Sequence, residues 1–150
     1  MPFVTLKEVL TAAKLGNYAV GAFNTNNMEI VQAIVEAAEE EKSPVILQAS
    51  QGALKYAGIR YITAMVQAAV ASSTVPIVLH LDHGTSFEQT MLCLKHGFTS
   101  VMFDGSKYSL AENIALTRRV AEVAHAMGAS IEGELGKIGG TEDDISVDER

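Results

Sequence analysis

Four residues of this sequence have side chains that together can bind a divalent cation. Asp82 and His83 follow one short apolar run, while Asp104 and Glu134 each follow another. Carboxylate oxygens and imidazole nitrogens are ligands for zinc and related metals. Any one of these residues could equally be a solvated cap of a following helix. Three converging carboxylates repel one another unless a cation lies among them, so the set of four predicts a metal site to which His83 supplies a nitrogen ligand.

An alternation of short β-branched segments and helical patterns positions these residues. Helices are indicated at 28–41 and 62–71, and after capping-box spacings at Ser86/Gln89 and Ser109/Glu112. Strands are predicted at 19–23, 45–48, 76–81, 100–103 and 130–134. Such alternation implies parallel strands joined by crossover helices, in either an open doubly wound sheet or a (β/α)8 barrel. The short strands and regular spacing favour the barrel, whose strands all end at one rim.

The length of the chain indicates an incomplete barrel. A complete (β/α)8 TIM barrel takes about 250 residues, and this chain has 150. We therefore predict an α/β fold of which the chain supplies about the first five β/α units. Residues 1–150 would be the N-terminal portion of a single barrel domain whose C-terminal portion is absent from this chain. Because a catalytic zinc commonly has three protein ligands and an open position, we expect some ligands to come from elsewhere.

Composition and charge exclude several classes of partner. The net charge is −7 and basic residues form no stripe, so we expect no nucleic-acid partner. Cys93 is the only cysteine, which favours a reducing compartment and a buried, unreactive thiol. The N-terminus lacks the pattern of a signal peptide, and no apolar run approaches the roughly 20 residues needed to cross a bilayer. We therefore expect a cytoplasmic protein without a membrane partner. His80, within a predicted strand, is expected to be an internal, hydrogen-bonded histidine or a partner of a metal ligand.

Five segments form an ordered set of motifs that covers almost the whole chain. They are 21–24 (GAFN), 44–50 (PVILQAS), 79–84 (LHLDHG), 97–104 (GFTSVMFD) and 132–144 (EGELGKIGGTEDD). Taken together and in register, they resemble class II, zinc-dependent fructose-bisphosphate aldolases. By this resemblance His83 would be a ligand of the catalytic Zn²⁺. Asp104 and Glu134 would hold a metal in an alternative, more buried position, which gives one catalytic site with a possible second position.

The same resemblance implies roles for four further residues. Asp82 would be the acid that protonates the aldehyde oxygen on condensation and takes that proton back on cleavage. Glu142 would be the base on a mobile loop that exchanges a proton at C3 of dihydroxyacetone phosphate. Ser50 and Asn24 would contact the substrate.

The activity implied is metal-dependent cleavage of fructose 1,6-bisphosphate to dihydroxyacetone phosphate and glyceraldehyde 3-phosphate, and the reverse condensation. No Lys falls at a predicted strand end, which disfavours the Schiff-base route. Tagatose 1,6-bisphosphate is an alternative substrate. A barrel metal hydrolase is a weaker alternative, because His80-Leu81-Asp82 breaks the His-x-His pattern. A non-catalytic half-barrel assembly module also remains open. We further expect a complementary C-terminal half as partner, a homo-oligomer, and no activity from residues 1–150 alone.

Overall fold

Five parallel strands form one sheet in the computed structural model of the chain, which describes residues 3–136 and the backbone of 140–142 and 145–147. The strand order β1-β2-β3-β4-β5 follows the sequence, so each strand pairs with the next one along the chain. The strands are β1 (Gly21–Asn24), β2 (Val45–Ala49), β3 (Ile77–Gly84), β4 (Ser100–Phe103) and β5 (Ser130–Gly133). This sequential parallel order is that of successive β/α units of a barrel and confirms the predicted α/β class.

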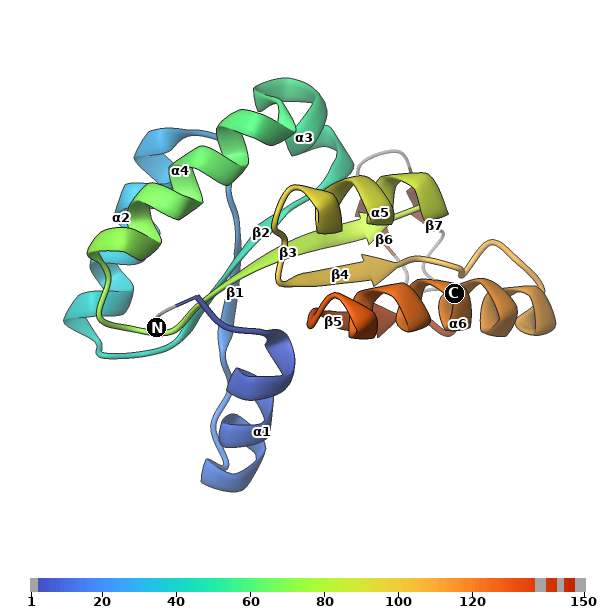
Figure 1. Cartoon of the computed structure of the whole chain (residues 1–150), viewed down its shortest axis with the longest axis horizontal. Coiled ribbons are helices and arrows are strands. Elements are labelled where there is room, and N and C mark those ends of the chain that lie inside the picture. Colours follow the sequence, from blue (N-terminus) through green and yellow to red (C-terminus); the bar gives the residue numbers. More distant parts are fainter. Residues whose placement is uncertain (1–2, 137–139, 143–144, 148–150) are drawn as a thin grey trace.

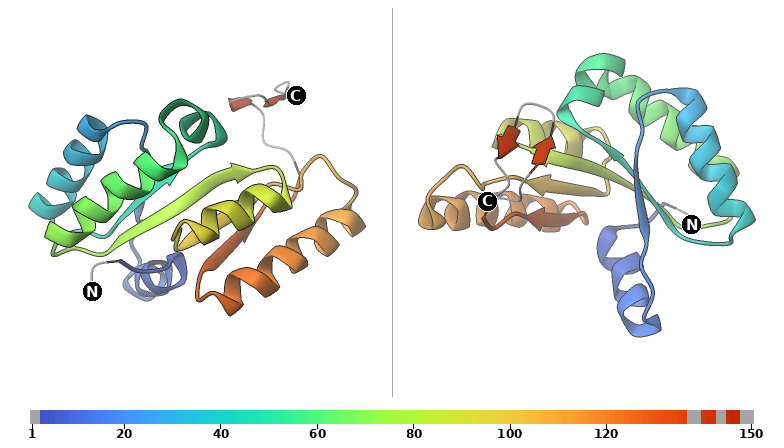
Figure 2. Two further views of the ribbon diagram at one scale, coloured as in Figure 1. Left: turned by 45° about the horizontal axis from the view of Figure 1, so that its top comes forward. Right: turned by 180° about the vertical axis from the view of Figure 1, so that it is seen from behind.

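Helices cover the two faces of the sheet unequally (Figures 1 and 2). They are α1 (Leu6–Gly16), α2 (Met28–Glu40), α3 (Gln51–Ala57), α4 (Ile59–Ser72), α5 (Phe87–Lys95) and α6 (Leu110–Ala126). In the larger hydrophobic cluster, the five helices α2 through α6 pack on one face of the sheet. This cluster includes Leu47, Leu79 and the fully buried Cys93. A smaller cluster joins α1 to Ile46 and Val78, which alternate with those residues and therefore lie on the opposite face.

The helix boundaries follow from capping chemistry that the sequence shows. The predicted capping box at Ser109 and Glu112 is present, since the serine hydroxyl accepts from the Glu112 N–H and the Glu112 carboxylate accepts from the Ser109 N–H. Ser86 also caps its helix by accepting from the Gln89 N–H. Gly97 and Gly128 have φ values of 87° and 74° directly after α5 and α6. That left-handed conformation ends a helix at little cost only in glycine.

Two helices were not predicted from the sequence. Helix α1 begins with a second capping box, at Thr5 and Glu8, whose spacing was available as a signal. Helix α3 lies where we expected only a connection, because one glycine in a seven-residue segment obscures the helical pattern. The limits of β1 and β5 also differ from the predicted ones by one or two residues, and β3 continues to Gly84, three residues beyond its predicted end. Nearer the C-terminus, β6 (Gly140–Glu142) and β7 (Ile145–Val147) form an antiparallel pair.

Polar side chains gather on the face of the sheet opposite α2–α6. His80 lies beside Gln48 of β2 and Ser100 of β4 in the strand register, and Ser100 lies beside Ser130 of β5. Gln48 and His80 lie on the same face of the sheet as Ile46 and Val78, two residues nearer the C-terminal ends of their strands. None of the helices in the described part of the chain has the length and apolar character needed to cross a membrane.

Candidate metal centre and acid–base site

A β-bulge at the end of β3 presents Asp82 and His83 to the same rim. Leu81 pairs with Val101 and Gly84 with Phe103, so three steps on β3 match two on β4. The extra residue interrupts the strict alternation of the strand. His83 occupies the left-handed region with φ 48°, which is uncommon for a residue with a side chain and is maintained by its surroundings.

Gly84 and Gln51 hold the bulge from two sides. A Cβ on Gly84 would lie 2.7 Å from the backbone oxygen of Met102 and 2.6 Å from Leu81 Cδ2, so a glycine is needed there. Gln51, at the start of α3, donates through Nε2 to the His83 carbonyl oxygen at 2.9 Å. This hydrogen bond fixes the peptide that carries the imidazole.

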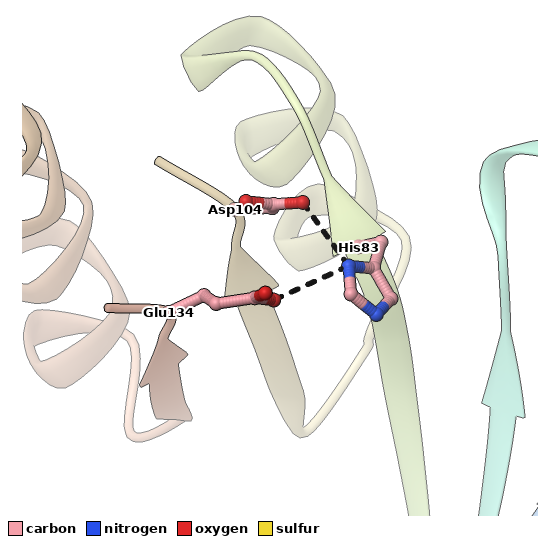
Figure 3. Close-up of side chains that lie close together, drawn as sticks. All are labelled: His83, Asp104 and Glu134. Atoms are coloured by element: carbon pink, nitrogen blue, oxygen red, sulfur yellow. Dashed lines mark hydrogen bonds and ion pairs between the residues drawn. The ribbon is translucent and has the colours of Figure 1, made fainter. Parts of the chain in front are cut away.

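The bulge brings His83 against two carboxylates from neighbouring strands (Figure 3). His83 Nδ1 lies 3.1 Å from Asp104 Oδ2 and 3.5 Å from Glu134 Oε2. One nitrogen and two oxygens, one from each residue, all lie within 4.8 Å of one another. His83 is the last residue but one of β3, and Asp104 and Glu134 directly follow β4 and β5. The predicted convergence of His83, Asp104 and Glu134 is therefore observed.

The environment of Asp104 favours its ionised form. The residue is buried, with 2% of its surface exposed. Burial raises the pKa of Asp104, but hydrogen bonds from Ser106 and His83 outweigh it and hold the pKa below its ordinary value. The Ser106 N–H donates to Asp104 Oδ1 at 2.9 Å, which leaves Oδ2 directed at His83. An ionised carboxylate with one oxygen already fixed is a ready ligand for a cation.

The residues fit a zinc ion in chemistry, and the two distances from His83 fit it in spacing. Tetrahedral ligands about 2.0–2.1 Å from zinc are about 3.3 Å from one another. The two distances from His83 Nδ1, 3.1 and 3.5 Å, bracket this value. They also allow a hydrogen bond from a protonated imidazole, so the arrangement accommodates either a proton on His83 or a metal ion that replaces it.

Asp82 belongs to a second, adjoining set of polar side chains. Gln48 donates through Nε2 to Asp82 Oδ2 at 3.0 Å and to Asn24 Oδ1 at 2.7 Å. The amide therefore links the ends of β1, β2 and β3 and orients the Asp82 carboxylate. Ser50 lies at the same rim, where its hydroxyl accepts from the Ala53 N–H as the N-cap of α3. The candidate residues Asn24, Ser50 and Asp82 are thus all placed at the C-terminal ends of the strands.

Below Asp82, a buried histidine contacts Ser100 and Glu132. His80 is 3% exposed, with Nδ1 2.9 Å from Ser100 Oγ and Nε2 3.5 Å from Glu132 Oε2. Burial, and to a smaller extent His83, lowers the pKa of His80 to about 4. Burial and then the charge of Asp82 raise the pKa of Glu132 above its ordinary value. Both shifts favour uncharged groups, so this contact is not a charged pair at neutral pH, and His80 is the internal, hydrogen-bonded residue that we expected.

One candidate residue falls largely outside the described part of the chain. The backbone of Glu142 pairs with Ile145 across β6 and β7, and its side chain is not among the described residues. The sequence places Gln48 at the end of the second predicted strand but assigns no role to it, nor to two further amides near the site, Gln51 and Asn113. Strand alternation could have found Gln48, which shares a face with His80. The two amides on helices gave no signal, because their contacts depend on how α3 and α6 pack on the sheet.

Comparison with known sequences identifies the family. The family model described as fructose-bisphosphate aldolase class-II matches residues 4–150. A fructose-bisphosphate aldolase of Thermus caldophilus is 52% identical over 147 residues, which cover 98% of this chain and 48% of the relative. One from Staphylococcus aureus is 48% identical over 151 residues, which cover 99% of this chain and 53% of the relative. The chain spans about half the length of the curated relatives it matches.

Solved structures agree in fold. The YdjI aldolase of Escherichia coli K12 superimposes with a TM-score of 0.85 at 33% identity, over 89% of this chain and 52% of that chain. A fructose-bisphosphate aldolase of Campylobacter jejuni superimposes with a TM-score of 0.79 at 25% identity, over 93% and 48%. These neighbours are (β/α)8 barrels, which confirms the predicted barrel class, with five β/α units in this chain. The family match, the relatives and the superpositions together show that the chain belongs to the class II fructose-bisphosphate aldolases.

Proposed function

We propose that this chain carries the metal-binding and acid–base part of an aldolase site that cleaves fructose 1,6-bisphosphate between C3 and C4. The observation that carries the proposal is the convergence of His83, Asp104 and Glu134 beside Asp82 at one rim of the sheet. Membership of the class II family and the names of the relatives support the choice of reaction and substrate. A ketose bisphosphate and dihydroxyacetone phosphate would be its ligands.

His83, Asp104 and Glu134 would hold Zn²⁺. His83 would be a ligand of the ion in its catalytic position, and the two carboxylates would bind it in an alternative, more buried position. Zinc bound there would supply Lewis-acid stabilisation of the negative charge that develops on a substrate oxygen. Ser106 keeps one oxygen of Asp104 occupied, so that the other remains directed at the ion. Gln51 keeps the His83 peptide in place.

Asp82 would hold and return the proton of the aldehyde oxygen. Its Oδ2 accepts from Gln48, which orients the carboxylate that would exchange a proton with the substrate. Asn24, which accepts from the same Gln48 amide, and Ser50 would contact the substrate beside it. Glu142 would be the base that exchanges the proton at C3 of dihydroxyacetone phosphate.

A complementary C-terminal half would complete the barrel and supply the remaining ligands. Within the described residues, β1 and β5 each pair with one neighbour only. All four residues of β1 are exposed, including Phe23 at 49%. An apolar groove lies beside β1 and α2, lined by residues such as Ile34, Ala37 and Pro44, and another lies beside β5 and α6. A further β/α unit added in parallel at each edge would cover both grooves.

The test uses the complete protein that contains this chain, purified and assayed for cleavage of fructose 1,6-bisphosphate with and without a chelator. Asp82→Asn should lower kcat by about 10²–10⁴-fold while Zn²⁺ affinity is retained. His83→Ala should weaken Zn²⁺ binding by at least about 100-fold and abolish turnover, since even outer partners of a metal cost 10–100-fold. His125→Ala, which removes an exposed imidazole on α6, is the matched control. Full activity in the presence of a chelator, or in both site variants, would refute the proposal.

Three finer assignments accompany the proposal. Tagatose 1,6-bisphosphate is the competing substrate, and comparison of the two cleavage rates decides between them; the names of the matched relatives favour fructose 1,6-bisphosphate. We also propose a cytoplasmic location and a homo-oligomer for the complete protein. Cell fractionation tests the first, and light scattering of the purified protein tests the second.

A further inference from the structure

Asn113, near the start of α6, is a buried polar residue between the ends of β4 and β5. Its exposed fraction is 7%. Its Nδ2 donates to the carbonyl oxygen of Glu134 at 2.7 Å, and its Oδ1 accepts from the Thr117 hydroxyl at 3.0 Å. The amide is therefore held by its own helix on one side and binds the main chain of a candidate metal ligand on the other.

The same amide rests on the backbone that follows Asp104. A Cβ built on Gly105 would lie 2.0 Å from Asn113 Oδ1 and 2.5 Å from its Cγ. No side chain fits there unless Asn113 moves. One turn further along the helix, Thr117 Cγ2 would lie 3.1 Å from a Cβ on Gly133. Helix α6 thus contacts the chain directly after one candidate carboxylate and directly before the other.

The Asn113 hydrogen bond lies where the sheet no longer fixes the chain. The register of β4 with β5 ends at Phe103 and Gly133, so Asp104 and Glu134 both lie just beyond it. The Asp104 N–H donates to the Gly84 carbonyl oxygen at 2.9 Å, which ties this residue to β3. The bond from Asn113 takes the place of the missing strand pairing at Glu134.

We propose that Asn113 is a positioning residue that sets the separation of the Asp104 and Glu134 carboxylates for the metal ion. The inference rests on the proposed function, because that proposal assigns the two carboxylates as ligands. Metal–ligand distances in well-formed sites lie within about 0.2 Å of their usual values. Glu134 Oε2 is 3.5 Å from His83 Nδ1, so a small retreat of the Glu134 backbone would take its carboxylate out of the ligand set.

The experiment measures metal binding in the complete protein rather than turnover alone. Asn113→Leu keeps the branched shape but removes both hydrogen bonds. Zn²⁺ affinity, measured by competition with a chromogenic chelator, should fall about 10–100-fold, the range seen when an outer partner of a ligand is lost. The visible absorption of the Co²⁺-substituted protein should also change, because it reports the number and arrangement of ligands.

Thr63→Val is the matched control for loss of a buried polar group. Thr63 is also 7% exposed, and its hydroxyl donates to Ile59 O within α4, so this hydrogen bond joins no two elements. This variant should lower the melting temperature yet keep the Zn²⁺ affinity and the Co²⁺ spectrum. If Asn113→Leu does not fold, Asn113→Ala, which adds no bulk, gives the same comparison.

Three outcomes are informative. Weaker Zn²⁺ binding and an altered Co²⁺ spectrum in the Asn113 variant, with neither in Thr63→Val, support the inference. Wild-type affinity and spectrum in a folded Asn113 variant overturn it while leaving the proposed function intact. A wild-type protein that binds neither Zn²⁺ nor Co²⁺ overturns both.

Discussion

The buried His80 makes the stability of the fold depend on pH in a way that can be calculated. Its imidazole is neutral in the folded state, because burial lowers its pKa from the ordinary value of 6.5 to about 4. In the unfolded chain it takes up a proton below pH 6.5. Lowering the pH from 7.5 to 5 therefore favours the unfolded state, which binds more protons. At pH 5 this linkage costs about 2 kcal/mol of unfolding free energy, and about 3 kcal/mol by pH 4.

The groups that face His80 set the sign of this effect. Ser100 shares a hydrogen bond with Nδ1, Glu132 of β5 lies 3.5 Å from Nε2, and His83 lies further along the same strand. Among these only an ionised Glu132 would favour a protonated imidazole. Burial raises the pKa of Glu132, which weakens that attraction as the pH falls. The contribution of neutral His80 to the free energy of unfolding is therefore fully present above pH 6.5 and is lost between pH 6.5 and about 4.

Denaturant unfolding at several pH values tests this calculation. The complete protein and its His80→Gln variant are compared in the presence of a chelator, because the metal ligands also bind protons. His80→Gln should be less stable at pH 7.5, and the gap should narrow by about 2 kcal/mol on going to pH 5, since the variant has lost the linked proton. The control His125→Gln removes an exposed imidazole, and its free energy of unfolding should change with pH as that of the wild type does. If the free energy of unfolding of His80→Gln has the same pH dependence as that of the wild type, burial does not lower the pKa of His80 and the prediction is wrong.

Three further predictions concern the bulge at Gly84, the Glu39 carboxylate, which accepts hydrogen bonds from residues 73–75, and the chain by itself. Gly84→Ala should lower the unfolding free energy by about 1–3 kcal/mol and weaken Zn²⁺ binding, because its Cβ would meet the Met102 backbone oxygen; denaturant midpoints and chelator competition measure the two effects. Glu39→Gln should destabilise the protein at neutral pH, because hydrogen bonds from Ser73 and Thr74 lower the pKa of Glu39 to about 2. The difference in stability between this variant and the wild type should vanish as the pH falls from 4.5 to about 2, and thermal melts at several pH values measure it. Residues 1–150 alone should bind Zn²⁺ weakly and cleave no fructose 1,6-bisphosphate, and turnover by the purified fragment would contradict the need for a second half.

Strand order and the position of the site followed from the sequence because both depend on local patterns. Short β-branched runs separated by capped helices specify parallel strands, and parallel strands bring their C-terminal ends to one rim. His83, Asp104 and Glu134 therefore converge as predicted, while Asp82 joins an adjoining set of polar side chains through Gln48. Helix α1 precedes the first strand and so lies outside the strand–helix alternation, and its capping box at Thr5 and Glu8 is the one local signal for it.

The bulge in β3 shows why the detailed geometry of the site could not be predicted. Strict alternation would send Asp82 and His83 to opposite faces of the sheet, and the sequence predicts only that alternation. The extra residue between Leu81 and Gly84 changes the register with β4, and His83 then occupies a left-handed conformation. That conformation is held by Gln51 from α3 and by the close contact of Gly84 with the backbone of β4. Since both contacts join segments distant in sequence, the direction of the His83 imidazole is a property of tertiary packing. Its encounter with Asp104 therefore depends on the bulge as much as on the ligands themselves.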